Sequence, residues 1–129
     1  MISLLILSHS PKIAEGVRDF ALQMTGETSI IAIGGTKTGT FGTDYDRTLV
    51  AMQKAVEQGE VIVLADIGSA RLTGQMAREA LDEKLMDRVF LSDAALVEGA
   101  LIAAIAIAAE QSSKEIMHQL QDYLLPKSD

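Results

Sequence analysis

The sequence predicts an α/β fold in which a parallel, doubly wound sheet lies between two layers of helices, forming a three-layer sandwich. Apolar runs at residues 4–7 and 61–65 lack the alternation of a half-exposed strand, which is typical of parallel strands covered on both faces. Segments with helical spacing follow the predicted strands, so strand and helix alternate along the chain. This order favours right-handed crossovers, with helices on both faces of the sheet.

The first half of the chain contains three of the predicted strands and two helices. Strands are expected at residues 2–8, 30–33 and 61–65, and helices at about 11–24 and 44–58. Ser10 suits the N-cap of the first helix, and Pro11 suits its first turn, where a missing N–H costs nothing. Apolar residues recur at helical spacing along this helix: Ile13, Val17, Phe20, Ala21 and Met24.

The second half continues the pattern with a helix at about 70–84, a strand at 89–91 and a helix at about 94–110. A last helix has Ile116, Leu120 and Leu124 about a turn apart and is expected to end near Pro126. The segment 94–109 is very apolar, but Glu98 interrupts it and it is shorter than the roughly 20 residues that cross a bilayer. We therefore expect a buried helix there and no association with a membrane.

The bulk composition limits the classes of function. A chain of 129 residues is expected to form one domain, spanning 1–129, and to bury roughly two thirds of the surface that its unfolded form exposes. A net charge of −7 argues against a nucleic-acid partner, which would require a basic face. The absence of cysteine excludes disulfides and thiol chemistry, and no N-terminal leader is recognisable, so a cytoplasmic location is expected.

Two of the predicted strands end in ionisable side chains. His9 follows the first strand and Asp66 follows the third, and ligands gather at the carboxyl ends of strands in open α/β sheets. An aspartate that accepts a hydrogen bond from one ring nitrogen leaves the other nitrogen as a nucleophile of fixed tautomer. The pair therefore suggests a catalytic geometry. An equally open alternative is that His9 is a polar turn residue and that Asp66 caps the next helix.

Other candidate residues lie near this pair in the sequence. The amides of Gly68 and Ser69, at a predicted helix N-terminus, would favour an anion beside His9, although ordinary capping explains them too. Arg71 is interpreted either as a solvated charge or as a phosphate partner. His118 is expected on a helix surface, and no ligand pair has the spacing of a metal site, so no bound metal is expected.

Residues 34–43 are rich in glycine and threonine and are predicted to form a loop. Their amides could cradle a phosphate, but the pattern matches neither G-x-x-x-x-G-K-[ST] nor G-x-G-x-x-G. We interpret the segment as a loop that docks a partner. The candidate residues are Gly34, Gly35, Thr36, Gly39, Gly42 and Thr43.

Three motifs resemble the IIA domains of the mannose class of the bacterial phosphotransferase system. They are Ile-Leu-Ser-His-Ser at residues 6–10, the glycine-threonine pairs of residues 34–43, and Leu-Ala-Asp-Ile-Gly-Ser-Ala at residues 64–70. The resemblance spans essentially the whole chain. The Asp-x-Gly-Ser-Ala turn is more similar to the DhaM group, the phosphoryl-donor subunits of phosphotransferase-dependent dihydroxyacetone kinases, than to sugar-transporter IIA domains.

The resemblance implies a relay function and a single-domain fold of the mannose-type IIA kind. His9 would accept a phosphoryl group from the phosphohistidine of HPr and pass it to ADP held by DhaL, and the ATP formed would phosphorylate dihydroxyacetone on DhaK. This chain would therefore bind no cofactor of its own. Asp66 falls on the position that orients the histidine, and Ser10, Gly68 and Ser69 fall where the phosphoryl oxygens would be held.

Members of this family usually form homodimers, so a homodimer is expected. Two other functions remain open. A sugar-transporter IIA domain would pass the phosphoryl group from His9 to a IIB domain, with the same chemistry but a different acceptor. A non-enzymatic, flavodoxin-like regulatory or binding module is the other alternative, but a receiver domain of that class would need acidic residues where Ser8-His9-Ser10 ends the first strand.

Overall fold

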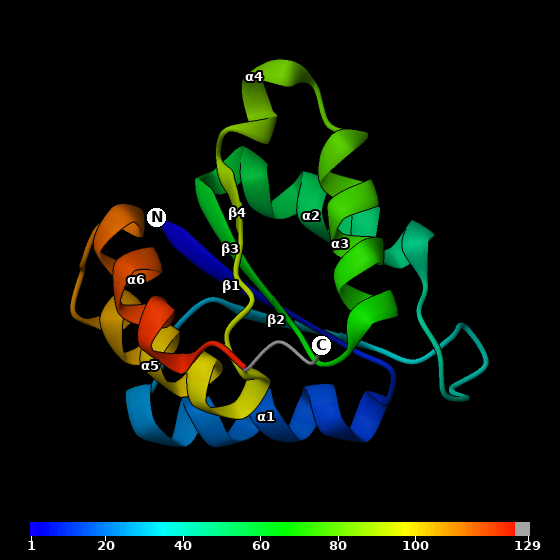
Figure 1. The fold of residues 1–129 in the computed structure, drawn as a ribbon, viewed down its shortest axis with the longest axis horizontal. Coiled ribbons are helices and arrows are strands. Elements are labelled where there is room, and N and C mark those ends of the chain that lie inside the picture. The colour runs from blue at the N-terminus through cyan, green and yellow to red at the C-terminus, as the bar shows by residue number, and fades with distance from the viewer. Residues whose placement is uncertain (126–129) are drawn as a thin grey trace.

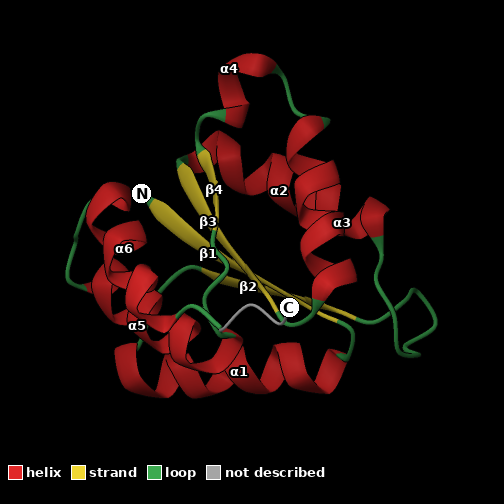
Figure 2. Cartoon of the chain, viewed as in Figure 1, coloured by secondary structure: helices red, strands yellow, loops and turns green. Residues whose placement is uncertain are grey.

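A computed structural model describes residues 1–125 and shows four strands in one sheet. The strands are β1 (Ile2–Ser8), β2 (Ile30–Gly34), β3 (Glu60–Ala65) and β4 (Val89–Leu91). Their order in the sheet is β2-β1-β3-β4 and every pairing is parallel, as Figure 2 shows. The predicted parallel sheet is confirmed. All the carboxyl ends of its strands therefore lie at one edge, which we call the carboxyl edge.

Helices cover both faces of the sheet, which confirms the predicted three-layer sandwich (Figure 1). One face carries α1 (Pro11–Thr25), α5 (Leu96–Ala108) and α6 (Ser113–Leu120). The other carries α2 (Tyr45–Gln58) and α3 (Gly68–Glu79), with the short α4 (Glu83–Met86) beyond them. A 3₁₀ turn, η1 (Gln121–Tyr123), follows α6.

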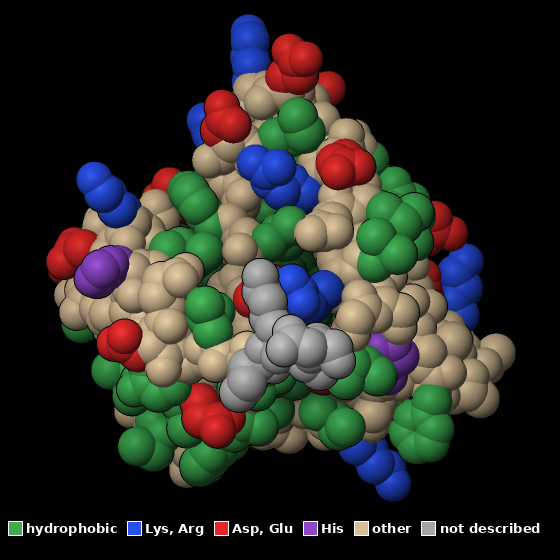
Figure 3. All heavy atoms as spheres, in the orientation of Figure 1, with side chains coloured by type: hydrophobic (Ala, Val, Ile, Leu, Met, Phe, Trp, Pro, Cys, Tyr) green, Lys and Arg blue, Asp and Glu red, His purple; other side chains and the backbone are tan. Residues whose placement is uncertain are grey.

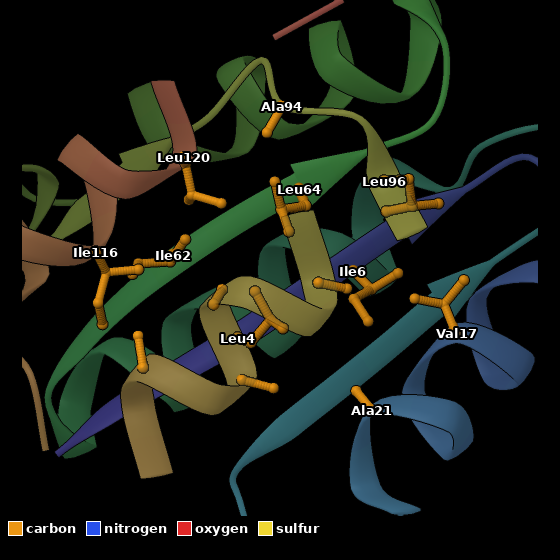
Figure 4. Close-up of a cluster of buried hydrophobic side chains, with 14 of the residues drawn as sticks. Leu4, Ile6, Val17, Ala21, Ile62, Leu64, Ala94, Leu96, Ile116 and Leu120 are labelled. Atoms are coloured by element: carbon orange, nitrogen blue, oxygen red, sulfur yellow. The ribbon is translucent and has the colours of Figure 1, made fainter. Parts of the chain in front are cut away.

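The hydrophobic core lies in two layers, one on each side of the sheet. β1 contributes to both: Leu4 and Ile6 belong to the layer under α1 and α5, and Leu5 and Leu7 to the layer under α2 and α3. This explains the apolar run without alternation, because each of these side chains is at most 2% exposed. Each such side chain contributes roughly 1.5–3 kcal/mol by its burial. Figure 4 shows the first layer, where side chains of β1 and β3 meet those of α1, α5 and α6.

The two helices of the first half begin as the sequence predicts. Ser10 is the N-cap of α1, its hydroxyl accepting a hydrogen bond of 3.3 Å from the amide of Ile13, and Pro11 occupies the first turn. Asp44 caps α2 in the same way, through a bond of 3.1 Å from the amide of Arg47. These caps fix where the loops before α1 and α2 end.

The face that α1 buries differs from the expected one. Small residues lie against the sheet, so the helix comes close to it, whereas three large residues of the predicted apolar set lie outward. The buried residues are Ala14, Val17 and Ala21, and the outward ones are Ile13, Phe20 and Met24, which are 47%, 50% and 61% exposed. The helical periodicity is confirmed, but the apolar face of α1 is broad, so that one side of it lies on the core and the outward stripe stays about half exposed.

The predicted helix over residues 70–84 is divided in two, which corrects that expectation. α3 ends at Glu79 and α4 begins at Glu83. Between them the chain turns, and Leu81, only 6% exposed, packs into the layer under α2 and α3. The burial of this leucine ends the first helix without the glycine or proline that usually marks such a break in a sequence.

Of the C-terminal elements, α5 begins later and α6 ends earlier than predicted. α5 begins at Leu96, and α6 ends at Leu120. Leu124 forms an antiparallel bridge with Ala94 instead of continuing a helix, and the amide of Ala95 donates to the carbonyl of Tyr123 at 2.8 Å. Pro126, the expected helix end, lies outside the described residues.

The apolar segment around residues 94–109 forms α5, which packs on the sheet as expected. Gly99 is close to β3, because a Cβ atom there would lie 3.2 Å from the side chain of Leu64. Small residues along α5 therefore allow a close helix-to-sheet contact. Within residues 1–125, no helix has the length and apolar character needed to cross a membrane.

Candidate active site

The two ionisable strand-end residues meet at the carboxyl edge of the sheet. β1 and β3 are neighbours, and their register pairs Leu7 with Ala65, so the residues that follow come side by side. The Nδ1 atom of His9 lies 2.9 Å from the Oδ1 atom of Asp66. Sequence reasoning expected this pair, and the structure brings it together with both side chains largely buried, 20% and 17% exposed.

Both carboxylate oxygens of Asp66 accept hydrogen bonds. Oδ1 accepts from the ring of His9 and from the amide of Ile67 at 2.7 Å, and Oδ2 accepts from the hydroxyl of Ser8 at 2.6 Å and the amide of His9 at 3.0 Å. Burial alone would raise the pKa of Asp66, but these hydrogen bonds outweigh it and hold the pKa below its ordinary value of 3.8. Asp66 is therefore ionised at neutral pH and acts only as an acceptor.

An ionised partner on Nδ1 decides the state of the His9 ring. Because Asp66 can only accept, Nδ1 carries the hydrogen of the neutral ring and Nε2 carries the free lone pair. Nε2 contacts the Oγ atom of Ser69, whose hydroxyl donates to that lone pair. The nitrogen available to act as a nucleophile is thus Nε2. The alternative in which Asp66 only caps a helix is wrong, since its carboxylate holds the ring of His9.

The N-terminus of α3 lies beside Nε2. α3 begins at Gly68, no side chain caps it, and Gly68 and Ser69 are exposed. Within residues 1–125, no backbone carbonyl accepts a hydrogen bond from either amide, as expected in the first turn of a helix. The hydroxyl of Ser69 thus contacts Nε2, and the two amides belong to the same first turn of the helix, where an anion is favoured.

Ser10 is engaged elsewhere. Its side chain is 6% exposed and accepts from the amide of Ile13, and its own amide donates to the Oγ atom of Ser8 at 3.1 Å. Both polar groups of Ser10 thus serve the turn between β1 and α1. Ser8 itself was missed by sequence reasoning. The available signal was a serine that ends an apolar strand directly before the histidine.

Two glycines predicted for the docking loop support the turn that carries His9. Gly34 is the last residue of β2 rather than a loop residue, and a Cβ atom there would lie 2.8 Å from Pro11 Cα. Gly35 has a positive φ of 72° and donates its amide to the carbonyl of Ser8 at 3.1 Å. A side chain at either position would push the loop away from this turn.

The rest of the loop closes on itself and returns to the site. The hydroxyls of Thr36 and Thr40 lie 2.6 Å apart, and the amide of Gly39 donates to the carbonyl of Thr36 at 3.0 Å. The amide of Gly42 donates to the carbonyl of His9 at 2.9 Å. Phe41, just before it, is 83% exposed. The half-buried Thr43 then leads to the cap of α2.

The remaining charged candidates lie outside the His9 network. Arg71 forms an ion pair with Asp93, which follows β4, and both side chains are about half exposed. His118 is exposed on α6, as predicted. Among residues 1–125, no three His, Asp or Glu side chains are grouped closely enough to hold a metal ion.

A sizeable hollow of the described residues lies away from this site. A cavity of about 680 Å³ lies at the opposite, amino edge of the sheet, where Glu27, Glu60 and Glu110 contribute to its wall. His9 and Asp66 do not line it. The candidate site is instead marked by the loop after β1 and the first turn of α3, which meet at His9.

Comparisons with known proteins show the family of the chain. A family model described as PTS system fructose IIA component, of the EIIA-man type, matches residues 3–120. A relative from Listeria innocua, named PEP-dependent dihydroxyacetone kinase 2, phosphoryl donor subunit DhaM, is 36% identical over 121 residues, covering 93% of this chain and 97% of that protein. The DhaM subunit from Escherichia coli is 33% identical, and this chain, covered completely, spans 30% of that longer protein.

Solved structures show the same fold. A crystal structure of a protein of unknown function is 32% identical, with a TM-score of 0.87, and the match covers 97% of this chain and 96% of that one. The phosphotransferase system component EIIA from Streptococcus agalactiae has a TM-score of 0.71 at 15% identity, covering 95% of this chain and 92% of that one. These matches support the predicted sandwich of the mannose-type IIA kind.

Proposed function

The chain belongs to the mannose-type IIA family of the phosphotransferase system, and within it to the DhaM group, and on this premise we propose that it is the phosphoryl donor subunit of a dihydroxyacetone kinase. His9 takes a phosphoryl group from phospho-HPr and passes it to ADP bound to DhaL. The ATP so formed phosphorylates dihydroxyacetone on DhaK. The observation that carries this proposal is the His9–Asp66 pair, which leaves Nε2 as a free nucleophile.

The transfer needs no proton movement at His9. The bond between phosphorus and the nitrogen of phospho-HPr breaks as the bond to Nε2 of His9 forms, while Nδ1 keeps its hydrogen on Asp66. In the second step the Nε2–phosphorus bond breaks and an oxygen of the ADP β-phosphate takes its place. Such a transfer depends mainly on positioning and electrostatic support, and the ionised Asp66 balances the positive charge that the ring acquires.

The phosphoryl oxygens are held by the start of α3. The hydroxyl of Ser69 now contacts Nε2 and turns to a phosphoryl oxygen once Nε2 is occupied. The amides of Gly68 and Ser69 add two donors at the positive end of the helix dipole. We assign Ser10 a more distant role in the same site, since its polar groups hold the turn that carries His9.

Donor and acceptor dock on the rim around His9. Phe41 is 83% exposed and precedes Gly42, whose amide donates to the carbonyl of His9. Ile67 is 63% exposed and follows Asp66, which accepts a hydrogen bond from the Ile67 amide. We propose that the partner proteins cover these apolar side chains when they dock. The net charge of −7 suits basic partner surfaces, and complementary charge mainly speeds their encounter. The glycine-threonine loop is thus proposed as part of the docking surface.

The proposed assembly follows from the same premise. Nucleotide stays on DhaL, so this chain holds no cofactor, and the relay operates in the cytoplasm. We also propose a homodimer. The outward stripe of α1, formed by Ile13, Phe20 and Met24, is an apolar surface that a second copy could cover, and green side chains line α1 at the bottom of Figure 3.

Two steps of one experiment test this function. The protein is incubated with enzyme I, HPr and phosphoenolpyruvate, and its intact mass is expected to rise by one phosphoryl group. The phosphorylated protein is then separated and mixed either with DhaL carrying ADP or with a IIB domain. We expect DhaL to remove the label and ATP to appear. Removal by the IIB domain alone would identify a sugar-transporter IIA domain, and no uptake at all would identify a non-enzymatic module.

A further inference from the structure

Ser8 is a buried polar residue at the end of a buried apolar strand. It is 2% exposed, as deeply buried as the apolar side chains of residues 4–7 that precede it on the strand. Placing a hydroxyl there costs free energy unless it is hydrogen bonded. The sheet register brings Ser8 beside Asp66, one step beyond the pairing of Leu7 with Ala65. The hydroxyl therefore lies next to the carboxylate that holds His9.

The hydrogen bonds of Ser8 run in one direction. The amide of Ser10 donates to Ser8 Oγ at 3.1 Å, and Ser8 Oγ donates to Asp66 Oδ2 at 2.6 Å. Because a hydroxyl has a single hydrogen, the bond from Ser10 occupies a lone pair and leaves that hydrogen for Asp66. Successive bonds of this kind polarise one another. The result is a short chain of donors that ends on the carboxylate.

This chain controls how Asp66 faces His9. Oδ2 accepts only from Ser8 and the amide of His9 within residues 1–125, while Oδ1 receives the ring hydrogen of His9. Loss of the Ser8 hydroxyl would leave Oδ2 with one donor, so that only the amides of His9 and Ile67 would hold the carboxylate and its orientation toward Nδ1 would be less fixed. The Nδ1–H tautomer would then lose its support, and Nε2 would more often carry the hydrogen and lose its nucleophilic lone pair.

Resting on the proposed function, we propose that Ser8 is a positioning residue for phosphoryl transfer, whose hydroxyl fixes the Asp66 carboxylate and, through it, the Nδ1–H tautomer of His9. Ser8 does not touch the phosphoryl group. Its hydroxyl raises the fraction of protein molecules in which Nε2 has its lone pair available when a phosphoryl donor binds.

β1 offers a matched control for this proposal. Ser3 is on the same strand, is 3% exposed, and makes a hydrogen bond of 2.9 Å to the hydroxyl of Ser29, far from His9. Ser8→Ala is expected to slow transfer from phospho-HPr to His9 about tenfold, the effect of losing one hydrogen bond to a charged group. Ser3→Ala removes an equally buried hydroxyl and is expected to leave the rate unchanged. Ser8→Thr keeps the hydroxyl and is expected to recover most of the rate.

The ring of His9 supplies a readout that a structural role would not change. Nitrogen NMR of the histidine ring reports which nitrogen carries the hydrogen. The Nε2–H tautomer is expected to increase in Ser8→Ala and not in Ser3→Ala. Should Ser8→Ala fail to fold, Ser8→Cys preserves the packing while replacing the hydroxyl by a weak donor, and the same increase is expected.

Each outcome decides for or against the role of Ser8. Wild-type transfer rate and wild-type tautomer in folded Ser8→Ala or Ser8→Cys would overturn it and leave the proposed function standing. Equal loss of rate in Ser3→Ala would also overturn it, since the effect would then be structural. If the wild-type protein took up no phosphate, the proposed function would fail, while the tautomer comparison would still test the link from Ser8 to His9.

Discussion

The two edges of the sheet use similar side chains in different ways. β1 has a buried serine near each end: Ser3 pairs with Ser29 alone, whereas Ser8 leads through Asp66 to His9. The amino edge has the more voluminous cavity, about 680 Å³, but the carboxyl edge has the hydrogen-bonded ion and the nucleophile. The candidate site is thus marked by fixed donors around a charge, not by the size of a hollow.

The largest expected effect tests whether the carboxyl edge is the only site of phosphorylation. His9→Ala removes Nε2 and is expected to abolish phosphate uptake from phospho-HPr while the fold persists, since His9 is partly exposed at a strand end. His118→Ala, on the exposed side of α6, is the control and is expected to accept phosphate normally. Intact mass measures both. Undiminished acid-labile phosphate on His9→Ala would contradict the assignment.

The next effect tests the role of the ion at this edge. In Asp66→Asn the side-chain amide can donate to Nδ1, which favours the Nε2–H tautomer and removes the nucleophile. We expect phosphoryl transfer to slow by about a hundredfold or more. Glu60→Gln, at the amino edge, removes a carboxylate that accepts from Ser113 and is expected to transfer normally. Stopped-flow or quench-flow transfer from phospho-HPr measures the ratio of the two rates.

A smaller effect is expected from the start of α3. Ser69→Ala removes the hydroxyl that contacts Nε2 but leaves both first-turn amides in place. We expect transfer to slow by about tenfold, as when one of several donors to a developing charge is lost. Thr73→Ala, one turn later on α3, removes a hydroxyl bonded to the carbonyl of Ser69 and serves as the control. Equal rates in wild type and Ser69→Ala would show that the amides alone hold the phosphoryl group.

The smallest effect is on the free energy of unfolding. Its dependence on pH is expected to differ between a substitution at the carboxyl edge and one at the amino edge. The pKa of Asp66 is lower in the folded protein than its ordinary value of 3.8, so Asp66 binds protons less readily when folded. Its stabilisation is fully present above the unfolded pKa and is lost as the pH falls through the folded pKa. The stability difference between wild type and Asp66→Asn should therefore be largest at neutral pH and shrink below about pH 4.

Ser3→Ala supplies the comparison from the amino edge. The bond between Ser3 and Ser29 joins two hydroxyls, so the cost of its loss, about 0.5–1.5 kcal/mol, should not change over the same pH range. Urea unfolding at several pH values measures both differences. If the loss of unfolding free energy caused by Asp66→Asn did not change with pH, the hydrogen bonds would not lower the pKa of this carboxyl.

The sequence allowed the sheet and the central pair to be predicted because both depend on local signals. The non-alternating apolar runs of β1 and β3 predict parallel strands buried on both faces, and His9 and Asp66 follow those runs directly. The division of the helix at residues 80–82 was not predictable, because Leu81 ends α3 through burial in the core, a tertiary contact. The outward stripe of α1 was not predictable either, because periodicity alone does not say which side of a broad apolar face lies on the core.

The supporting residues of the site were harder to predict than the pair itself. Ser8 reaches Asp66 only because β1 and β3 are neighbours in a particular register, which no local pattern states. Ser10 was expected at the phosphoryl group, but its role as N-cap of α1 uses its hydroxyl. Gly34 was placed in the loop, whereas it ends β2 and packs against the turn after His9. For Ser8 and Gly34 a contact between distant segments decides the role, whereas for Ser10 the local cap that the sequence also predicted decides it.

The atom that carries the phosphoryl group gives the most direct test of this account. NMR spectra of the phosphorylated protein, labelled with ¹⁵N, resolve which ring nitrogen of His9 is coupled to phosphorus. The hydrogen bond from Nδ1 to the ionised Asp66 predicts phosphorus on Nε2, with the hydrogen retained on Nδ1. Phosphorus on Nδ1, or on any residue other than His9, would contradict it.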